Sequence, residues 1–350
     1  MKQKYQVVFF LIFITNLHSQ VIDIITGLNA QRGILFNGND LYIAQSGTSV
    51  ISKVDISIIP PTITDVVTNL GLPISLAING NELYFSDGSV TNGKIFKINI
   101  SDASPVAIEV ITGLNGARGI LLNGNELYIA EFSGGKVSKI NITETMPTLT
   151  TVVSGLNTPT ELLINGDDLY ISEFGGDKIS KIDITTPLPT VTDVITGLNS
   201  PVGMLKIGNY LYITESFANK ISKIDITEVF PIAQDVLTGL SNPRILLLKD
   251  NELYISQYGN GIISKIALSS LTTNENVVKK NLIVLPNPSS NFLVVHGLDK
   301  PEKYEIYNSI GQKISNQIIT NNEKIDIQNL TDGVYFLKFE SGNTLKFIKE

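Results

Sequence analysis

The stretch GLNGARGILLNGNELYIAEFSGGKVSKINI, residues 113–142, decides the fold because the chain repeats it. Its leucine–tyrosine pair returns in six copies, with the tyrosines at Tyr42, Tyr84, Tyr128, Tyr170, Tyr212 and Tyr254. Neighbouring tyrosines are 42 residues apart, except for 44 residues between the second and the third. A period of this length is typical of four-stranded propeller blades and is longer than the period of helical arrays such as tetratricopeptide or ankyrin repeats.

Each copy contains the pattern of a four-stranded sheet. Two short apolar runs at 120–122 and 127–130 flank an Asn-Gly turn, which favours a tight hairpin because both residues tolerate a positive φ. A third strand is expected at 136–142 and an outer strand at 150–154. Large apolar residues occupy both faces of the second strand, so the sheet must be covered on both sides. Blades stacked around an axis meet this requirement.

The two ends of the repeat region predict a closed ring. The sixth copy stops after its third strand at 263–268, and the segment 21–26 matches the outer strands of other copies, such as 192–196. We therefore expect the N-terminal strand to complete the last blade and remove the free sheet edges. The predicted fold is all-β, a six-bladed β-propeller followed by a small antiparallel β-sandwich.

The sequence divides into four predicted parts. Residues 1–19 have a short basic start and an apolar run that is too short to span a bilayer, as in a secretory signal peptide. The propeller is expected at 20–268, a polar linker at 269–281, and the β-sandwich, with its short alternating strands, at 282–350. No later segment is long and apolar enough to be a transmembrane helix.

The last seventy residues carry several separated motifs in a fixed order. They are Pro286, Asn287 and Pro288, the turn glycine Gly311, the pair Gly333 and Tyr335, and Lys346 near the end. In this order and spacing they resemble the C-terminal sorting domain of type IX secretion cargo in Bacteroidetes. The resemblance implies a route through the periplasm and across the outer membrane by the type IX secretion machinery. It places the product outside the cell or on the outer cell surface.

The repeats resemble NHL-type six-bladed propellers. The closest copy has Pro201-Val202-Gly203, then Gly208-Asn209, then a strand at 211–215 that ends in an acid. This resemblance covers 21–268 and implies architecture rather than activity, because propellers carry many unrelated functions.

Composition excludes several function classes. Residues 20–268 contain 15 Lys and Arg against 24 Asp and Glu, a net charge of −9, so nucleic acid is a poor partner. The two histidines are His18 and His296, outside the propeller, so serine–histidine or histidine–metal catalysis cannot operate within it. The chain has no cysteine, hence no disulfide.

A candidate site follows from pairing residues at equal distances from the hairpin turn. Arg118 then faces Glu131 at the end of the second strand, beside the axis. The equivalent first-strand positions are Arg32, Ile74, Arg118, Thr160, Val202 and Arg244. The equivalent second-strand positions are Gln45, Asp87, Glu131, Glu173, Glu215 and Gln257. The second set predicts a ring of acids around one mouth of the channel, with Glu161 as a further carboxylate nearby.

Two interpretations of the acidic ring stay open. Clustered carboxylates raise one another's pKa unless a cation or an arginine neutralises them, so a cationic ligand or calcium fits there; no other cofactor is expected. Alternatively, the repeated acids bond to backbone amides of the next loop and are structural. Glu161 breaks the repeat and is least explained by that alternative.

The leading hypothesis is an exported, non-catalytic binding protein. Its ligand would be a glycan, a peptide or a cation, bound through Asp87, Arg118, Glu131, Glu161, Glu173 and Glu215. The alternative is a lactonase-like, divalent-metal-dependent hydrolase or lyase that uses the same carboxylates. A structural surface protein with an inert channel is a third hypothesis.

Overall fold

The computed structural model describes residues 21–272, 282–298, 300–340 and 344–350. The predicted signal peptide and most of the predicted linker lie outside these residues. The chain divides into two compact units, Met1–Thr273 and Asn274–Glu350, and strands dominate the described part of each.

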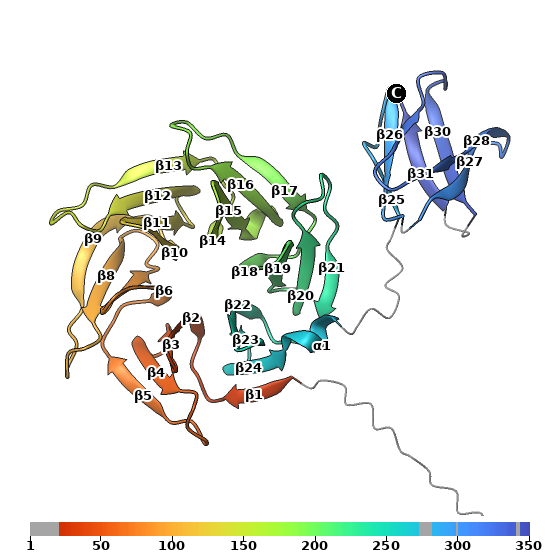
Figure 1. Cartoon of the computed structure of the whole chain (residues 1–350). Helices are drawn as coiled ribbons and strands as arrows, with labels where there is room; N and C mark the ends of the chain where they lie inside the picture. Colours follow the sequence, from red (N-terminus) through yellow and green to blue (C-terminus); the bar gives the residue numbers. More distant parts are fainter. Residues whose placement is uncertain (1–20, 273–281, 299, 341–343) are drawn as a thin grey trace, which may run out of the picture. The chain divides into compact units, whose positions relative to one another are not determined.

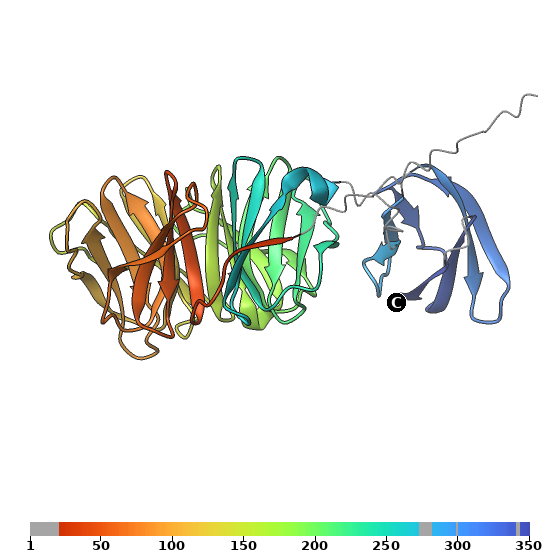
Figure 2. The ribbon, with the colours of Figure 1, turned by 90° about the horizontal axis from the view of Figure 1, so that it is seen from below.

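The described residues of the first unit form six four-stranded antiparallel sheets, the blades of a β-propeller. Figure 1 shows the blades around a common centre, and Figure 2 shows the same ring from its side. The first strand of each blade is innermost and the fourth is outermost.

The blades contain the following strands in order from the centre outward. Blade 1 has β2 (Gln31–Asn37), β3 (Asp40–Gln45), β4 (Val50–Asp55) and β5 (Ile63–Val67). Blade 2 has β6 (Pro73–Asn79), β7 (Glu82–Asp87), β8 (Gly93–Asn99) and β9 (Ile108–Leu114). Blade 3 has β10 (Ala117–Asn123), β11 (Glu126–Glu131), β12 (Lys136–Asn141) and β13 (Thr150–Ser154).

Blades 4 to 6 follow the same plan. Blade 4 has β14 (Pro159–Asn165), β15 (Asp168–Glu173), the 3-10 turn η1 (Phe174–Gly176), β16 (Lys178–Asp183) and β17 (Thr192–Thr196). Blade 5 has β18 (Pro201–Ile207), β19 (Tyr210–Glu215), β20 (Lys220–Asp225) and β21 (Gln234–Leu237). Blade 6 has β22 (Pro243–Lys249), β23 (Glu252–Gln257), β24 (Ile262–Ala267) and β1 (Ile22–Ile25).

Apolar clusters between neighbouring blades form the core. Tyr128 and Ala130 of blade 3 pack with Leu162 and Ile171 of blade 4, all almost fully buried. Both faces of the second strand are therefore inside, as its sequence predicts. A side chain of the size of Leu162 or Ile171 contributes roughly 1.5–3 kcal/mol by leaving water, and equivalent contacts recur between the blades around the ring.

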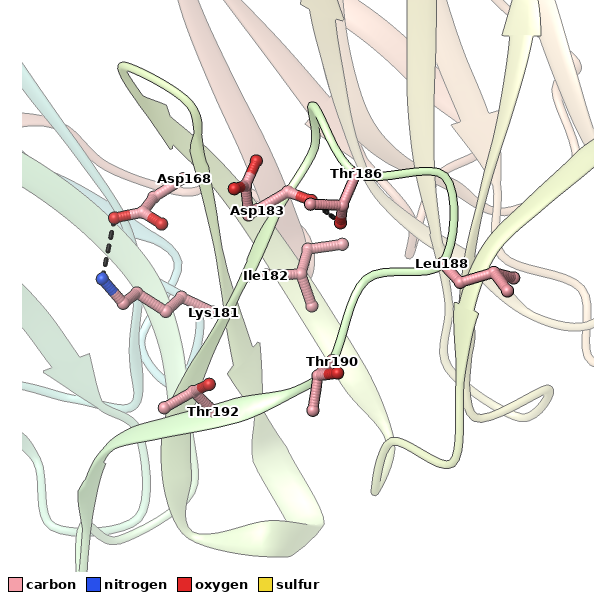
Figure 3. Close-up of a pocket in the computed structure, with 8 residues that line it drawn as sticks. All are labelled: Asp168, Lys181, Ile182, Asp183, Thr186, Leu188, Thr190 and Thr192. Carbon is pink, nitrogen blue, oxygen red and sulfur yellow. Dashed lines mark hydrogen bonds and ion pairs between the residues drawn. The ribbon is translucent and has the colours of Figure 1, made fainter.

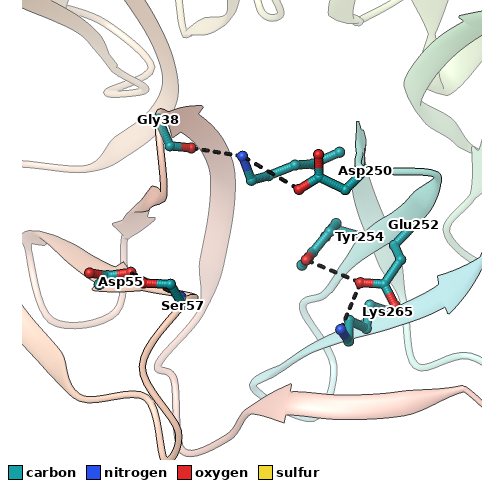
Figure 4. A network of polar contacts seen from close by, with 8 residues as sticks. Gly38, Asp55, Ser57, Asp250, Glu252, Tyr254 and Lys265 are labelled. Atoms are coloured by element: carbon teal, nitrogen blue, oxygen red, sulfur yellow. Dashed lines mark hydrogen bonds and ion pairs between the residues drawn. The ribbon is translucent and has the colours of Figure 1, made fainter.

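The N-terminal strand closes the ring. β1 pairs antiparallel with β24, and the Ser264 hydroxyl donates to the Asp23 carboxylate at 2.7 Å. The predicted completion of the last blade is confirmed. Where blade 6 meets blade 1, the Lys249 ammonium donates to the Gly38 carbonyl at 3.1 Å. Within blade 6, Lys265 pairs with Glu252 at 2.6 Å (Figure 4).

Innermost strands approach one another so closely that three positions require glycine. A Cβ on Gly203 would lie 2.1 Å from the Arg244 carbonyl oxygen of the next blade, and one on Gly33 would lie 2.4 Å from the Ile74 oxygen. Gly119 is in similar contact with Thr160. These contacts set the width of the centre, because neighbouring blade backbones touch there.

The second unit is a small β-sandwich, as predicted. One sheet has the order β25-β26-β29 and the other has β28-β27-β30-β31. Their strands are β25 (Ile283–Leu285), β26 (Phe292–His296), β27 (Glu302–Asn308), β28 (Lys313–Ile319), β29 (Lys324–Asp326), β30 (Gly333–Phe339) and β31 (Thr344–Lys349). Leu293, Ile306, Leu337 and Phe347 belong to the buried cluster that its described residues form.

The linker prediction needs one correction. Helix α1 (Leu268–Thr272) occupies the start of the predicted linker, and Leu271 packs into the core of the last blades. The serines in this segment suggested a loop, whereas its two leucines anchor a helical turn. Among the described residues, none of the helical segments has the length and apolar character of a membrane span.

Closure by β1 predicts a difference between two isoleucines of that strand. Ile25 is 4% exposed and Ile22 is 54% exposed. Ile25→Ala should lower the free energy of unfolding by about 2–4 kcal/mol because it leaves a cavity at the seam. Ile22→Ala should change it by about 0.5 kcal/mol or less. Urea denaturation measures both, and equal effects would contradict the packing of β1 into the core.

Candidate functional site

Every innermost strand has an irregularity just after its first residue. In blade 3, Ala117 lies opposite Glu131, but the next aligned pair is Ile120 opposite Ile129, so β10 contains one extra residue. The predicted pairing of Arg118 with Glu131 is therefore wrong, because counting from the turn cannot reveal a bulge. A bulge turns side chains to new directions, and here it separates Arg118 from the residue at the strand end.

The predicted acids are bonded within their own blades. Glu131 is fully buried, and its carboxylate accepts from the Asn115 amide at 2.9 Å and from the Ser138 hydroxyl at 2.5 Å. The Lys136 ammonium lies 3.2 Å away. Glu131 thus connects the loop before β10 to the third strand.

The other acids repeat this arrangement. Glu173 accepts from the Asn157 amide and Ser180, and Glu215 accepts from the Asn199 amide and Ser222. Asp87 accepts from the Leu72 amide at 3.3 Å and from Ser89 at 2.7 Å.

Glutamines fill the same role in two blades. The side-chain oxygens of Gln45 and Gln257 accept from the amides of Asn29 and Ser241. Since a neutral amide serves as well, the position requires hydrogen bonding rather than charge. The acids do not form an open ring, and the described residues contain no group of three or more His, Cys, Asp or Glu that could hold a metal ion.

Two glutamates of blade 3 provide a matched test of this structural role. Glu131→Ala should lower the free energy of unfolding by about 2–4 kcal/mol, because it leaves a buried amide and a hydroxyl without their acceptor. Glu126→Ala removes a partly exposed ion pair with Lys139 and a hydrogen bond from the Tyr128 hydroxyl, and should cost about 1.5 kcal/mol or less. Chemical denaturation checks the difference, and similar losses in the two variants would argue against the buried anchor.

Three arginines converge at the mouth where these strands begin. Arg32, Arg118 and Arg244 are the only arginines of the chain, and each is the second residue of an innermost strand. They come from blades 1, 3 and 6, so Arg118 and Arg244 lie in opposite blades of the ring. The Arg32 Nε donates to the Ser46 hydroxyl at 3.1 Å.

Aromatic rings flank the three guanidinium groups. Arg118 lies over the Phe132 ring at 4.5 Å, while Arg32 and Arg244 lie over the Tyr258 ring at 5.0 and 4.9 Å. Phe174 packs 6.2 Å from Phe132, measured between ring centres. The mouth therefore combines positive charge with apolar surface.

A row of phenylalanines continues across the neighbouring blades. Phe174 contacts Phe217 edge to face at 5.4 Å, and Phe217 is 61% exposed. Phe132, Phe174 and Tyr258 each follow the end of a second strand directly. The apolar side of the mouth thus reaches solvent at Phe217.

No carboxylate in the described part of the chain offsets the arginine charges. Burial, together with repulsion from Arg32, lowers the pKa of Arg118 to about 10. Burial and repulsion from Arg32 and Arg118 lower the pKa of Arg244 to about 10. The Nε atoms of Arg118 and Arg244 are buried without a hydrogen-bond acceptor. All three groups remain cationic at neutral pH. A negatively charged group would offset their charge and supply the missing hydrogen-bond acceptors.

The sequence contains signals that would have located this mouth. Every arginine of the chain occupies one repeat position, and lysine provides all other cationic side chains of the propeller. The residue after the second strand is aromatic in three copies and Ser46, Gly88 or Ser216 in the others. Departures from the repeat, rather than its shared acids, mark the cluster.

Glu161 is the third residue of β14, the innermost strand of blade 4. Its carboxyl group lies beside Gly119, where a Cβ would be 3.3 Å from its Cδ. Burial raises the pKa of Glu161 to about 8, although the Leu162 amide partly stabilises the charged form. At neutral pH the group is largely protonated, so it can donate as well as accept a hydrogen bond.

Glu161 predicts a pH-dependent stability. Between its ordinary pKa of 4.5 and about 8, the folded chain binds the proton more tightly than the unfolded chain. Stability is therefore full below this window and declines as pH rises through it. Relative to Glu161→Gln, the wild type should lose on the order of 2 kcal/mol between about pH 5 and 8. Urea midpoints at several pH values measure this, and parallel profiles would disprove it.

A surface pocket of about 280 Å³ lies on blade 4 (Figure 3). Its lining residues come from the second, third and fourth strands of that blade and from the loop between the last two, and they include no arginine. Its polar wall is the ion pair between Lys181 and Asp168 at 2.8 Å. Equivalent pairs recur in other blades, such as Lys53 with Asp40. The repetition indicates a structural pair rather than a specific site.

In the sandwich, the predicted sorting motif joins the chain end to the rest of the sheet. Asn287, between Pro286 and Pro288, donates to the Lys346 carbonyl at 3.0 Å and accepts from the Ile348 amide at 2.9 Å. Tyr335, two residues after Gly333, stacks on Phe347. Gly311 has a φ of +79° in the turn between β27 and β28.

Residues 283–350 match the secretion system C-terminal sorting domain. The match confirms the predicted sorting domain and indicates export by type IX secretion to the cell surface or the medium. No curated protein matches the chain.

Solved structures similar to the chain are propeller-like proteins. An auxiliary nutrient binding protein of Bacteroides thetaiotaomicron has a TM-score of 0.60 at 13% identity, covering 70% of this chain and 75% of its own. Another auxiliary nutrient binding protein, from Bacteroides ovatus, has a TM-score of 0.58 at 16% identity, covering 72% of this chain and 74% of its own. Virginiamycin B lyase from Staphylococcus aureus has 0.52 at 15%, covering 95% and 99%. At these identities the likeness concerns the fold alone.

Proposed function

We propose that this chain is an exported, non-catalytic binding protein that holds an anionic ligand at the arginine–aromatic mouth. The carrying observation is the convergence of Arg32, Arg118 and Arg244 with no carboxylate among the described residues to offset their charge. Like charges gathered in a half-buried position are costly unless a ligand offsets them. This proposal replaces the cationic ligand expected from the sequence.

Three further observations support a binding role. The arginine fork suits carboxylate and phosphate oxygens, and the aromatic rings supply contact area. The sorting domain brings the propeller outside the cell, where it can meet external ligands. Two structural neighbours are described as auxiliary nutrient binding proteins, a role compatible with such a mouth.

A metal-dependent hydrolase or lyase remains the second candidate because of one residue. Glu161 has the raised pKa typical of catalytic carboxyl groups. Its predicted partners, Glu131, Glu173 and Glu215, are already bonded to amides and hydroxyls. Catalysis would therefore need a further group beyond this set.

Thermal melting in different anions tests the binding proposal. At matched ionic strength, phosphate in place of chloride should raise the melting temperature of the wild type by about 2–4 °C more than that of Arg118→Gln/Arg244→Gln. Comparing the two proteins removes the general effect of phosphate on folding. Lys53→Gln/Lys94→Gln, which removes two surface cations paired with Asp40 and Glu109, serves as the charge-matched control.

Two outcomes would count against the proposal. Equal phosphate responses in the wild type and the double variant would separate anion binding from the arginines. A rise in melting with calcium that a chelator reverses, and that Glu161→Gln abolishes, would favour the metal-dependent candidate instead.

A further inference from the structure

We propose that the mouth selects a compact group bearing two negative charges, such as a phosphate monoester or a closely spaced dicarboxylate, over single charges and over long polyanions. This inference rests on the proposed anion-binding function. It concerns the charge and the size of the group that the arginines receive.

The number of cations favours a doubly charged group. Arg32 and Arg244 lie over the same Tyr258 ring at 5.0 and 4.9 Å, and Arg244 is also repelled by Arg118. A single negative charge would leave two of them uncompensated and still repelling each other. A second charge on the same group offsets this repulsion.

The placement of the arginines favours a compact group. Arg118 and Arg244 come from opposite blades, and each has a buried Nε without an acceptor. Two neighbouring rings connect the two arginines, because Arg118 lies over Phe132, Arg244 lies 5.9 Å from the Phe174 ring, and these two rings are 6.2 Å apart. Neighbouring oxygens of one small group near the axis can therefore accept from both sides at once.

The surrounding surface disfavours a long polyanion. The propeller carries a net charge of −9, so a charged chain that extends beyond the mouth would cross an acidic surface. Ten of its twelve lysines are paired with carboxylates, as Lys94 is with Glu109 and Lys220 with Asp235. Uncompensated positive charge is concentrated in the arginine cluster, which fits a small molecule or the charged end of a chain.

Two sugar esters of the same shape separate charge from geometry. Glucose 6-phosphate is a dianion near neutral pH, whereas glucose 6-sulfate is a monoanion with the same tetrahedral group and carrier. Calorimetric titration of the purified protein at about pH 7.5 should show at least about tenfold tighter binding of the phosphate. Lowering the pH to about 5.5 should weaken the binding of glucose 6-phosphate, because the phosphate group gains a proton. The affinity for glucose 6-sulfate should stay unchanged.

Variants and competitors complete the test. Arg118→Gln and Arg244→Gln should each lower the affinity for glucose 6-phosphate by about tenfold or more, and Lys94→Gln should leave this affinity unchanged. Malonate, a compact dianion, should compete with it, whereas acetate and dextran sulfate at equal total charge should not. Melting curves establish that each variant is folded.

The outcomes distinguish this inference from the proposed function. Equal affinity for the two esters, or competition by dextran sulfate, would overturn the selection of a compact dianion while anion binding stands. If none of the probes binds, both are wrong. Selective binding of malonate without the phosphate would identify a dicarboxylate as the source of the two charges.

Discussion

One buried side chain at the end of each second strand organises the whole propeller. Glu131 binds the amide of the loop that leads into its blade and a hydroxyl of the third strand, and glutamine or acid does the corresponding work in the other blades. These bonds fix the start of every innermost strand. The arginines are the second residues of such strands. The hydrogen bonds of the buried Glu and Gln side chains therefore position the arginines, although the arginines do not form these bonds.

Much of the fold could be predicted because repetition and turn chemistry are local signals. The hairpin at Gly124, the third strand and closure by β1 all agree with the structure. The bulge near Arg118 could not be predicted, since no residue type requires an extra position there. An acid that faces the channel and an acid buried in the blade have the same sequence pattern, and only knowledge of the bulge distinguishes them.

The candidate site was predictable in part. The expected pairing with Glu131 points to Arg118 and the departure from the repeat points to Glu161, and both residues have unusual electrostatics in the structure. The glutamates were selected because they recur, and recurrence marked a structural need. In a repeat protein, shared polar residues serve the unit that is copied, while a single ligand at the axis is contacted by residues that differ between copies. Phe132 and Tyr258 also occupy a repeat position whose residue differs between copies.

The seam between β1 and β24 sets the order of assembly. The hydrogen bond from Ser264 to Asp23 joins residues separated by 241 positions, so nearly the whole propeller must be made before its first strand finds a partner. Contacts of such long range form late, because the chain between them must first be ordered. The first strand stays without its blade until the last blade exists. A ring that begins and ends in one sheet therefore completes itself only as a whole, and a truncated chain displays an open edge that distinguishes it from the finished molecule.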